Sequence, residues 1–139
     1  MSVLVRDVMT ADPVSLDAGT PVSEAAKKMK EHDIGDVIVV EGGRVCGIVT
    51  DRDIVVRAVG EDKDPTATPL GEICSRDVMT VSPDDDLTVA GDRMRERAVR
   101  RMPVVEDGRA VGIVSIGDLA VERDPHGAIA DISSAAPND

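Results

Sequence analysis

With 139 residues, of which 42% are hydrophobic and 31% charged, the chain has the composition of a globular protein large enough to bury a core. Its net charge of −11 opposes nonspecific binding to nucleic acid or to an anionic membrane, because both need clustered Lys and Arg. Phe, Tyr and Trp are absent, so aliphatic side chains and Met must fill the core, and a bound base cannot stack on a ring.

Targeting signals and metal ligands are not evident. The longest apolar run, residues 37–40, is too short to span a bilayer, and we expect a cytoplasmic protein. Cys46 and Cys74 belong to no CxxC motif, which favours buried free thiols over a disulfide or redox pair. His32 and His126 have no second ligand at helical spacing, so we expect surface residues and no metal site.

The first half of the chain alternates helical and extended patterns. Residues 3–9 read as a short helical lead-in and residues 13–16 as an extended segment. An amphipathic helix is predicted from residue 20 or 21 to about residue 32, because apolar residues recur at i, i+3, i+4 and i+7: Val22, Ala25, Ala26 and Met29.

A hairpin and a helix follow. Strands 36–41 and 44–50 flank Gly42-Gly43, a pair that favours a tight turn. The next helix is predicted over about residues 51–59, with a buried stripe and a C-cap candidate formed by Ile54, Val55, Ala58 and Gly60.

The second half repeats this order after a charged, Pro-containing linker. We expect a lead-in helix over residues 70–79 and an extended segment at 81–83. A helix then carries Leu87, Ala90, Gly91 and Met94, strands 102–106 and 109–115 flank Asp107-Gly108, and a helix covers 116–122. Residues 124–139 are a tail in which Asp124-Pro125 can start a short helix through residue 132.

The two halves are an internal repeat. GIVTDRD at 47–53 and GIVSIGD at 112–118 share a pattern at an offset of 65 residues. RDVMT occurs at 6–10 and again at 76–80, an offset of 70, which predicts five extra residues in the first repeat between Thr10 and Val22.

The repeated turn has two interpretations. Thr50 is a preferred helix N-cap and Asp53 lies in the first helical turn, so the pair can form a capping box that satisfies backbone N–H groups. The hydroxyl and the carboxylate can also bind the vicinal hydroxyls of a ribose, with a helix N-terminus nearby for phosphate. Recurrence as Ser115 with Asp118 favours the functional interpretation.

Metal and catalytic chemistry are less well supported. In the acidic run Asp84 to Asp86, consecutive carboxylates point in different directions, and Asp86 serves as a helix N-cap. No Ser/His/Asp or Cys/His set can be assembled, and Asp51 beside Asp53 lacks a paired base. We therefore expect no metal site and no enzyme.

The matched residues resemble those of a known family. They include RDVMT, MPVV at 102–105, Met29 with Met94, Gly43-Arg44 with Gly108-Arg109, and the doubled turn. Over residues 3–122 the chain resembles a tandem pair of cystathionine-β-synthase (CBS) domains, a Bateman module. EHDIG at 31–35 and TDRDIV at 50–55 also resemble small stand-alone bacterial two-repeat proteins linked to stress or hypoxia responses.

The resemblance implies an α/β (α+β) fold of two β-α-β-β-α repeats packed with pseudo-two-fold symmetry. It places repeat 1 with its lead-in helix at 1–60, a linker at 61–69, repeat 2 at 70–123 and a tail at 124–139. It also implies a regulatory module, commonly a homodimer, that binds an adenine nucleotide or adenosyl ligand in clefts between the repeats and needs no other cofactor.

The family's binding positions map onto both repeats. Thr50 with Asp53, and Ser115 with Asp118, would hold the ribose, while Val14, Val81, Val37 and Met102 would hold the base through backbone and aliphatic groups. The binding set also includes Gly35 and Pro103. Arg100 and Arg101, with Arg97, precede the second middle strand and suit phosphate, although a solvated edge is an equal alternative.

The first repeat departs from this pattern. It has His32, Asp33 and Asp36 in place of the arginines, and Ile38 where the family commonly has proline. One cleft is therefore expected to prefer AMP, ADP or ATP, and the other to be empty or to take an uncharged or cationic adenosyl ligand such as S-adenosylmethionine. The alternatives are a ligand-free, dimeric interaction or scaffold protein of the stress-response type and an undetected enzyme. The downstream partner is not identifiable.

Overall fold

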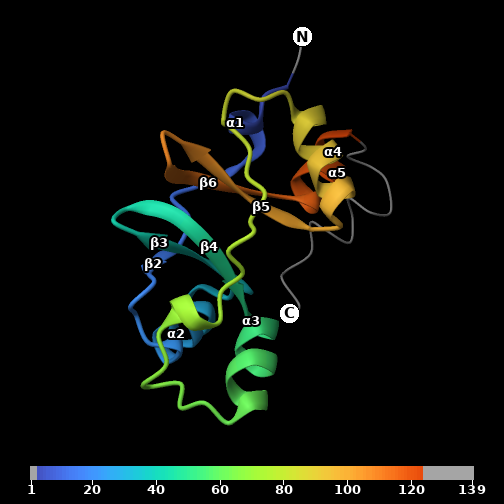
Figure 1. Cartoon of the computed structure of the whole chain (residues 1–139). Helices are drawn as coiled ribbons and strands as arrows, with labels where there is room; N and C mark the ends of the chain where they lie inside the picture. Colours follow the sequence, from blue (N-terminus) through green and yellow to red (C-terminus); the bar gives the residue numbers. More distant parts are fainter. Residues whose placement is uncertain (1–2, 124–139) are drawn as a thin grey trace. The chain divides into compact units, whose positions relative to one another are not determined.

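A computed structural model describes residues 3–123 of the chain (Figure 1). Its elements are α1 (Val5–Val8), β1 (Thr10–Ala11), β2 (Ser15–Asp17), α2 (Val22–His32), β3 (Asp36–Glu41), β4 (Arg44–Thr50), α3 (Asp51–Asp53), η1 (Ile54–Ala58), η2 (Val59–Glu61), η3 (Leu70–Glu72), α4 (Leu87–Arg97), β5 (Arg101–Glu106), β6 (Arg109–Ser115) and α5 (Ile116–Arg123). None of the helices in this described part is long and apolar enough to cross a membrane. His126 and the helix suggested near residues 124–132 lie outside the described residues.

The chain forms two compact units. The central unit comprises residues 14–78, and the terminal unit combines residues 3–13 with residues 79–123. Each has a three-stranded sheet, ordered β2-β3-β4 in the central unit and β1-β6-β5 in the terminal unit. The mixed α/β fold class is confirmed, but the compact units divide the chain differently from the two sequence repeats.

The hairpins follow the predicted strands closely. β3 and β4 have the predicted bounds, and β5 begins one residue earlier than expected. Gly42 and Gly43 turn the first hairpin with φ of 59° and 81°, and Asp107 and Gly108 turn the second with 54° and 82°. Both residues of each turn have positive φ, the requirement of a tight turn that matches the twist of the strands.

Each unit has its own aliphatic core. In the central unit Val22, Ala25 and Met29 of α2 pack in one cluster with Val37, Val39 and Val49. In the terminal unit Leu87, Ala90 and Met94 of α4 pack in one cluster with Met102, Val104 and Val114. The predicted helical stripes are confirmed except at Ala26, which is exposed, and Gly91, which is half-buried.

A lead-in segment pairs with the last strand of each hairpin. In the central unit Ser75 exchanges two backbone hydrogen bonds with Ile48 of β4, at 2.9 and 3.1 Å. In the terminal unit Thr10 of β1 pairs with Ile113 of β6. Each unit therefore takes its lead-in from the other sequence repeat.

These pairings correct the predicted insertion. Thr10 and Ser75 are structural counterparts 65 residues apart, as are their partners Ile113 and Ile48. The next segment keeps the same spacing, because Leu16 pairs with Val39 and Val81 pairs with Val104. The repeat thus runs without five extra residues, and the two RDVMT segments are not structural counterparts.

Two helix predictions also need correction. The expected helix over residues 70–79 is reduced to the single turn η3, because Ser75 must be extended to pair with β4. The helix after Thr50 runs through α3, η1 and η2 to Glu61, and the left-handed residue Asp62 (φ 57°) ends it in place of Gly60. Val55, predicted to be buried, is 61% exposed.

Candidate functional site at the two strand-to-helix turns

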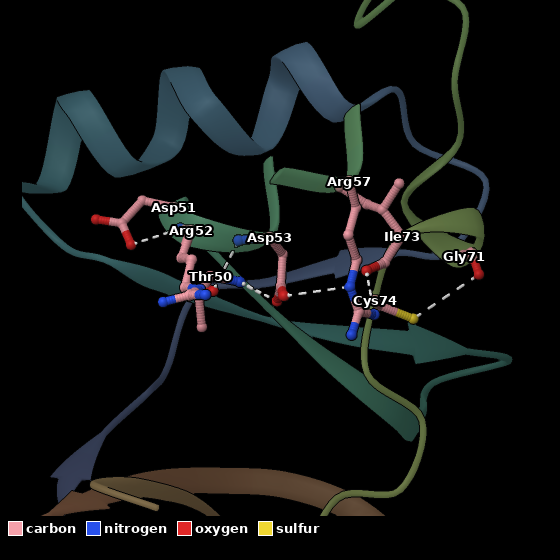
Figure 2. A network of polar contacts seen from close by, with 8 residues as sticks. All are labelled: Thr50, Asp51, Arg52, Asp53, Arg57, Gly71, Ile73 and Cys74. Atoms are coloured by element: carbon pink, nitrogen blue, oxygen red, sulfur yellow. Dashed lines mark hydrogen bonds and ion pairs between the residues drawn. The ribbon is translucent and has the colours of Figure 1, made fainter. Parts of the chain in front are cut away.

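The turn after β4 is a closed capping box. The Thr50 Oγ1 accepts a hydrogen bond from the Asp53 N–H at 3.1 Å, and the Asp53 Oδ2 accepts one from the Thr50 N–H at 2.9 Å (Figure 2). Both residues are half-buried. The helix therefore begins at Thr50 because two orphan backbone donors are satisfied by side chains of the same turn.

The turn after β6 has the same geometry. The Ser115 N–H donates to Asp118 Oδ2 at 2.8 Å, and the Asp118 N–H donates to Ser115 Oγ at 3.2 Å. The capping interpretation is thus confirmed in both repeats. It does not use the whole bonding capacity of the pair, because each hydroxyl can still donate its proton and each carboxylate can accept further bonds.

Arg57 extends the first turn and was not predicted. Its Nε lies 3.8 Å from Asp53 Oδ1, and its guanidinium donates to the Ile73 carbonyl at 3.3 Å (Figure 2). One side chain thus links the turn carboxylate to the segment that follows η3. The i, i+4 spacing from Asp53 on a predicted helix could have identified this pair.

Strand register places opposite charges beside the two turns. Asp36 is the cross-strand partner of Thr50, and Arg101 is the cross-strand partner of Ser115. Directly opposed residues have Cβ atoms about 4.5–5.5 Å apart, so each charge belongs to the immediate surroundings of its turn. The sequence difference before the two middle strands therefore becomes a reversal of charge at equivalent positions.

Gly35 and Arg100 also lie at these turns through their backbones. The Gly35 carbonyl accepts from the Asp51 N–H at 3.0 Å, and the Arg100 carbonyl accepts from the Ile116 N–H at 2.8 Å. The side chains of Arg100 and Arg101 are exposed. Two of the predicted phosphate-binding arginines are therefore at the terminal unit's turn.

The residues predicted to hold a base lie on or beside the middle strands. Val37, Met102 and Val81 are at most 2% exposed and belong to the cores. The half-buried Val14 accepts a hydrogen bond from the Ile38 N–H through its carbonyl at 3.0 Å.

Proline changes this backbone pattern in the terminal unit. Pro103, the counterpart of Ile38, has no N–H, so the carbonyl of Met79, the counterpart of Val14, receives no such bond. The carbonyl of the buried Pro103 accepts a hydrogen bond from the Val81 N–H at 3.2 Å. The two repeats therefore differ in backbone donors as well as in charge.

Cys46 and Cys74 are free thiols in the central unit. Cys74 is buried two residues after the end of η3, where its Sγ contacts the Gly71 carbonyl at 3.9 Å (Figure 2). Burial raises the pKa of both thiols above the ordinary value. The reactive thiolate is therefore disfavoured at neutral pH. The prediction of buried free thiols is confirmed for Cys74, whereas Cys46 is half-buried.

The acidic run before α4 is engaged in separate local contacts. Asp86 accepts from the Thr88 N–H at 2.9 Å and caps α4 as predicted. Asp85 accepts from the Ser82 N–H at 2.9 Å, and Asp84 pairs with Arg6. Across residues 3–123, no group of three or more His, Cys, Asp or Glu side chains is arranged to hold a metal ion.

Comparisons with known proteins agree with this geometry. A family model described as CBS domain matches residues 5–60 and 70–123. The CBS domain-containing protein YhcV of Bacillus subtilis is 37% identical over 119 residues, covering 86% of this chain and 84% of the relative. Hypoxic response protein 1 of Mycobacterium tuberculosis is 34% identical over 122 residues, covering 87% and 85%.

Solved structures give the same result. The CBS domain pair of protein MJ0100, in complex with 5-methylthioadenosine and S-adenosyl-L-methionine, superposes with a TM-score of 0.80 at 28% identity, covering 91% of this chain and 100% of the other. Hypoxic response protein I with two coordinated zinc ions gives 0.78 at 32% identity, covering 86% and 98%. With its two matched repeats and its two capped turns, the chain belongs to the CBS domain family.

Proposed function

We propose that the chain is a regulatory module that binds an adenine nucleotide or adenosyl ligand at its strand-to-helix turns. The observation that carries this proposal is the doubled hydroxyl–carboxylate pair, Thr50 with Asp53 and Ser115 with Asp118, held rigidly by reciprocal capping bonds. The vicinal hydroxyls of a ribose can accept a hydrogen bond from the hydroxyl of the turn and can donate hydrogen bonds to its carboxylate. The adenosyl ligands of the similar MJ0100 pair support this ligand class.

The two turns have different preferences in this proposal. Arg101 beside Ser115 favours the phosphates of AMP, ADP or ATP, whereas Asp36 beside Thr50 repels them. The central unit's turn then stays empty or takes an uncharged or cationic adenosyl compound such as S-adenosylmethionine.

Regulation in this proposal rests on thermodynamic linkage between ligand binding and a conformational equilibrium. A ligand shifts the equilibrium between two conformations, or between two arrangements of a homodimer, only as far as its affinity differs between them. Catalysis is not required for such a role. The module would therefore act on a partner protein or through its own assembly state.

The absorption spectrum of the purified protein tests ligand binding. The chain has no Phe, Tyr or Trp, so a bound purine would dominate the near-ultraviolet spectrum. If a purine stays bound after desalting, we expect its absorption band at about 260 nm. If binding is weaker, we expect added AMP, ATP or S-adenosylmethionine to raise the unfolding temperature. A flat spectrum with no thermal shift for any of the three would contradict the proposal.

Matched aspartate variants test the asymmetry. Asp118→Ala should weaken AMP binding by about 10-fold or more, because it removes a charged hydrogen-bond acceptor, while Asp53→Ala should change it little. Titration calorimetry measures both. Equal losses of AMP affinity in the two variants would show that the turns do not differ in ligand preference.

A ligand-free scaffold is the second candidate function. It is favoured by one observation, that the capping bonds alone account for Thr50, Asp53, Ser115 and Asp118. Unfolding temperatures that are equal with and without nucleotides would support it. Turnover of a bound nucleotide would instead reveal an enzyme.

A further inference from the structure

Arg57 holds two parts of the central unit at once. Its Nε faces the Asp53 carboxylate at 3.8 Å, and its Nη1 donates a hydrogen bond to the Ile73 carbonyl at 3.3 Å (Figure 2). Asp53 belongs to the candidate turn, whereas Ile73 begins segment 73–75, in which Ser75 pairs with Ile48 of β4. One side chain therefore joins a proposed binding group to a segment that is distant in sequence.

The two oxygens of Asp53 have different roles. Oδ2 accepts from the Thr50 N–H and closes the cap, whereas Oδ1 faces Arg57. A ligand hydroxyl that donates to Oδ1 leaves the cap intact. The ligand and Arg57 therefore meet at the same oxygen.

The contact between Asp53 and Arg57 is weak enough to be exchanged. At 3.8 Å it is longer than a hydrogen bond, and 51% of the Arg57 side chain is exposed, so water can solvate the guanidinium when it leaves. The Asp53 side chain is only 15% exposed and is held by the cap. A ligand hydroxyl therefore displaces Arg57 more readily than it moves the carboxylate.

The other contact of Arg57 supports a buried backbone group. Ile73 is 1% exposed, and no backbone N–H of the described residues donates to its carbonyl. Arg57 thus supplies the hydrogen bond that a buried carbonyl needs. When Arg57 leaves, the carbonyl loses this donor, and segment 73–75 separates from β4 at a lower cost.

We propose that Arg57 is a positioning residue that couples the occupancy of Asp53 to segment 73–75. A hydroxyl that binds Asp53 Oδ1 displaces the guanidinium and thereby weakens the pairing of the segment with β4. The ligand in this inference rests on the proposed function, whereas the coupling between Asp53 and the segment can be measured without a ligand. Arg57 then makes the first step by which binding at the turn alters the surrounding fold.

Hydrogen exchange of the Ser75 amide, followed by NMR on the full chain, tests the coupling. This amide donates to the Ile48 carbonyl at 2.9 Å. Asp53→Asn keeps an acceptor for the Thr50 N–H but removes the charge that faces Arg57. It should quicken the exchange about 3- to 10-fold, the effect of weakening one hydrogen bond. Arg57→Met should have the same effect, and the double variant should exchange no faster than Arg57→Met alone.

A lysine variant separates this role from a purely structural one. Arg57→Lys keeps the positive charge, but one ammonium group cannot hold both Asp53 and the Ile73 carbonyl, so adding Asp53→Asn should no longer change the exchange. Asp51→Asn is the matched control, because the Asp51 carboxylate accepts from the Arg52 N–H in the same turn and should leave Ser75 unaffected. Additive effects of Asp53→Asn and Arg57→Met, or coupling that persists in Arg57→Lys, would overturn the proposal.

Adenosine extends the test to a ligand that has vicinal hydroxyls and no charge. It should quicken Ser75 exchange about 3- to 10-fold in the wild type and leave it unchanged in Arg57→Met. Coupling is reciprocal, so Arg57→Met should bind adenosine about 3- to 10-fold more tightly in titration calorimetry. Weaker binding would contradict displacement. If adenosine binds no variant while Asp53 and Arg57 remain coupled, the proposed function fails and the role of Arg57 stands.

Discussion

Thr50 and Asp53 combine a structural role with a spare binding capacity. Their side chains close the first turn of the helix, and the same closure fixes the orientation of the hydroxyl and carboxylate toward any ligand. A rotamer held in place by the fold loses little entropy when a ligand binds. Capping and recognition are therefore compatible at this residue pair.

Removing the cap hydroxyl should destabilise the helix start. We expect Thr50→Ala to lower the free energy of unfolding by about 1 kcal/mol, because the Asp53 N–H loses its acceptor. Ser115→Ala should cost a similar amount for the same reason. Urea unfolding followed by circular dichroism measures both. Thr50→Ser keeps the hydroxyl and is the control, so a loss as large as that of Thr50→Ala would argue against capping.

Residue spacing was informative where contacts are local. The Ser/Thr-x-x-Asp pattern predicted the capping partners because its side chains and backbone N–H groups lie within one turn. The burial of Val55 was predicted wrongly, because apolar periodicity assumes an unbroken α-helix while residues 54–58 form a π-helical turn. The side of a short helix that meets the core depends on packing that the periodicity does not contain.

Lead-in segments and hairpins show the same contrast at the level of elements. Alternating apolar residues and two-residue turns located the hairpin strands almost to the residue. The repeated RDVMT sequence gave a wrong alignment of the two repeats. Thr10 pairs with β6 and Ser75 pairs with β4, so Thr10 and Ser75 are the structural counterparts. That pairing joins segments distant in sequence, so local patterns could not reveal it.

Two strand glycines permit these lead-ins to approach. A Cβ on Gly47 would lie 2.6 Å from the Ser75 carbonyl oxygen, and one on Gly112 would lie 2.9 Å from that of Thr10. We expect Gly47→Ala and Gly112→Ala each to destabilise the protein by about 1–3 kcal/mol, the usual cost of overpacking. Chemical unfolding measures the loss.

Gly19→Ala is the matched control. Its Cβ would meet nothing closer than 3.6 Å, so its stability should stay within about 0.5 kcal/mol of the wild type. If Gly47→Ala were as stable as this control, the close backbone approach would be contradicted.

At the scale of the whole molecule, the two repeats were predictable and the composition of the compact units was not. The sequence alone predicts the offset between the two strand-to-helix turns, and it shows the difference in charge between Asp36 and Arg101. The assignment of residues 3–13 to the same unit as residues 79–123 depends on tertiary pairing. Charge difference and unit composition together determine which groups surround each candidate turn.

The split terminal unit also sets an order of events during synthesis on the ribosome. All residues of the central unit exist once residue 78 is made, whereas the terminal unit needs β6, which ends 37 residues later at Ser115. The segment that pairs with β6 ends at Ala11, 104 residues before Ser115, so at roughly 5–20 residues per second it waits about 5–21 s for its partner strand. During that interval Val5, which becomes fully buried in the finished fold, has no core to enter and is open to chaperones or to another nascent chain.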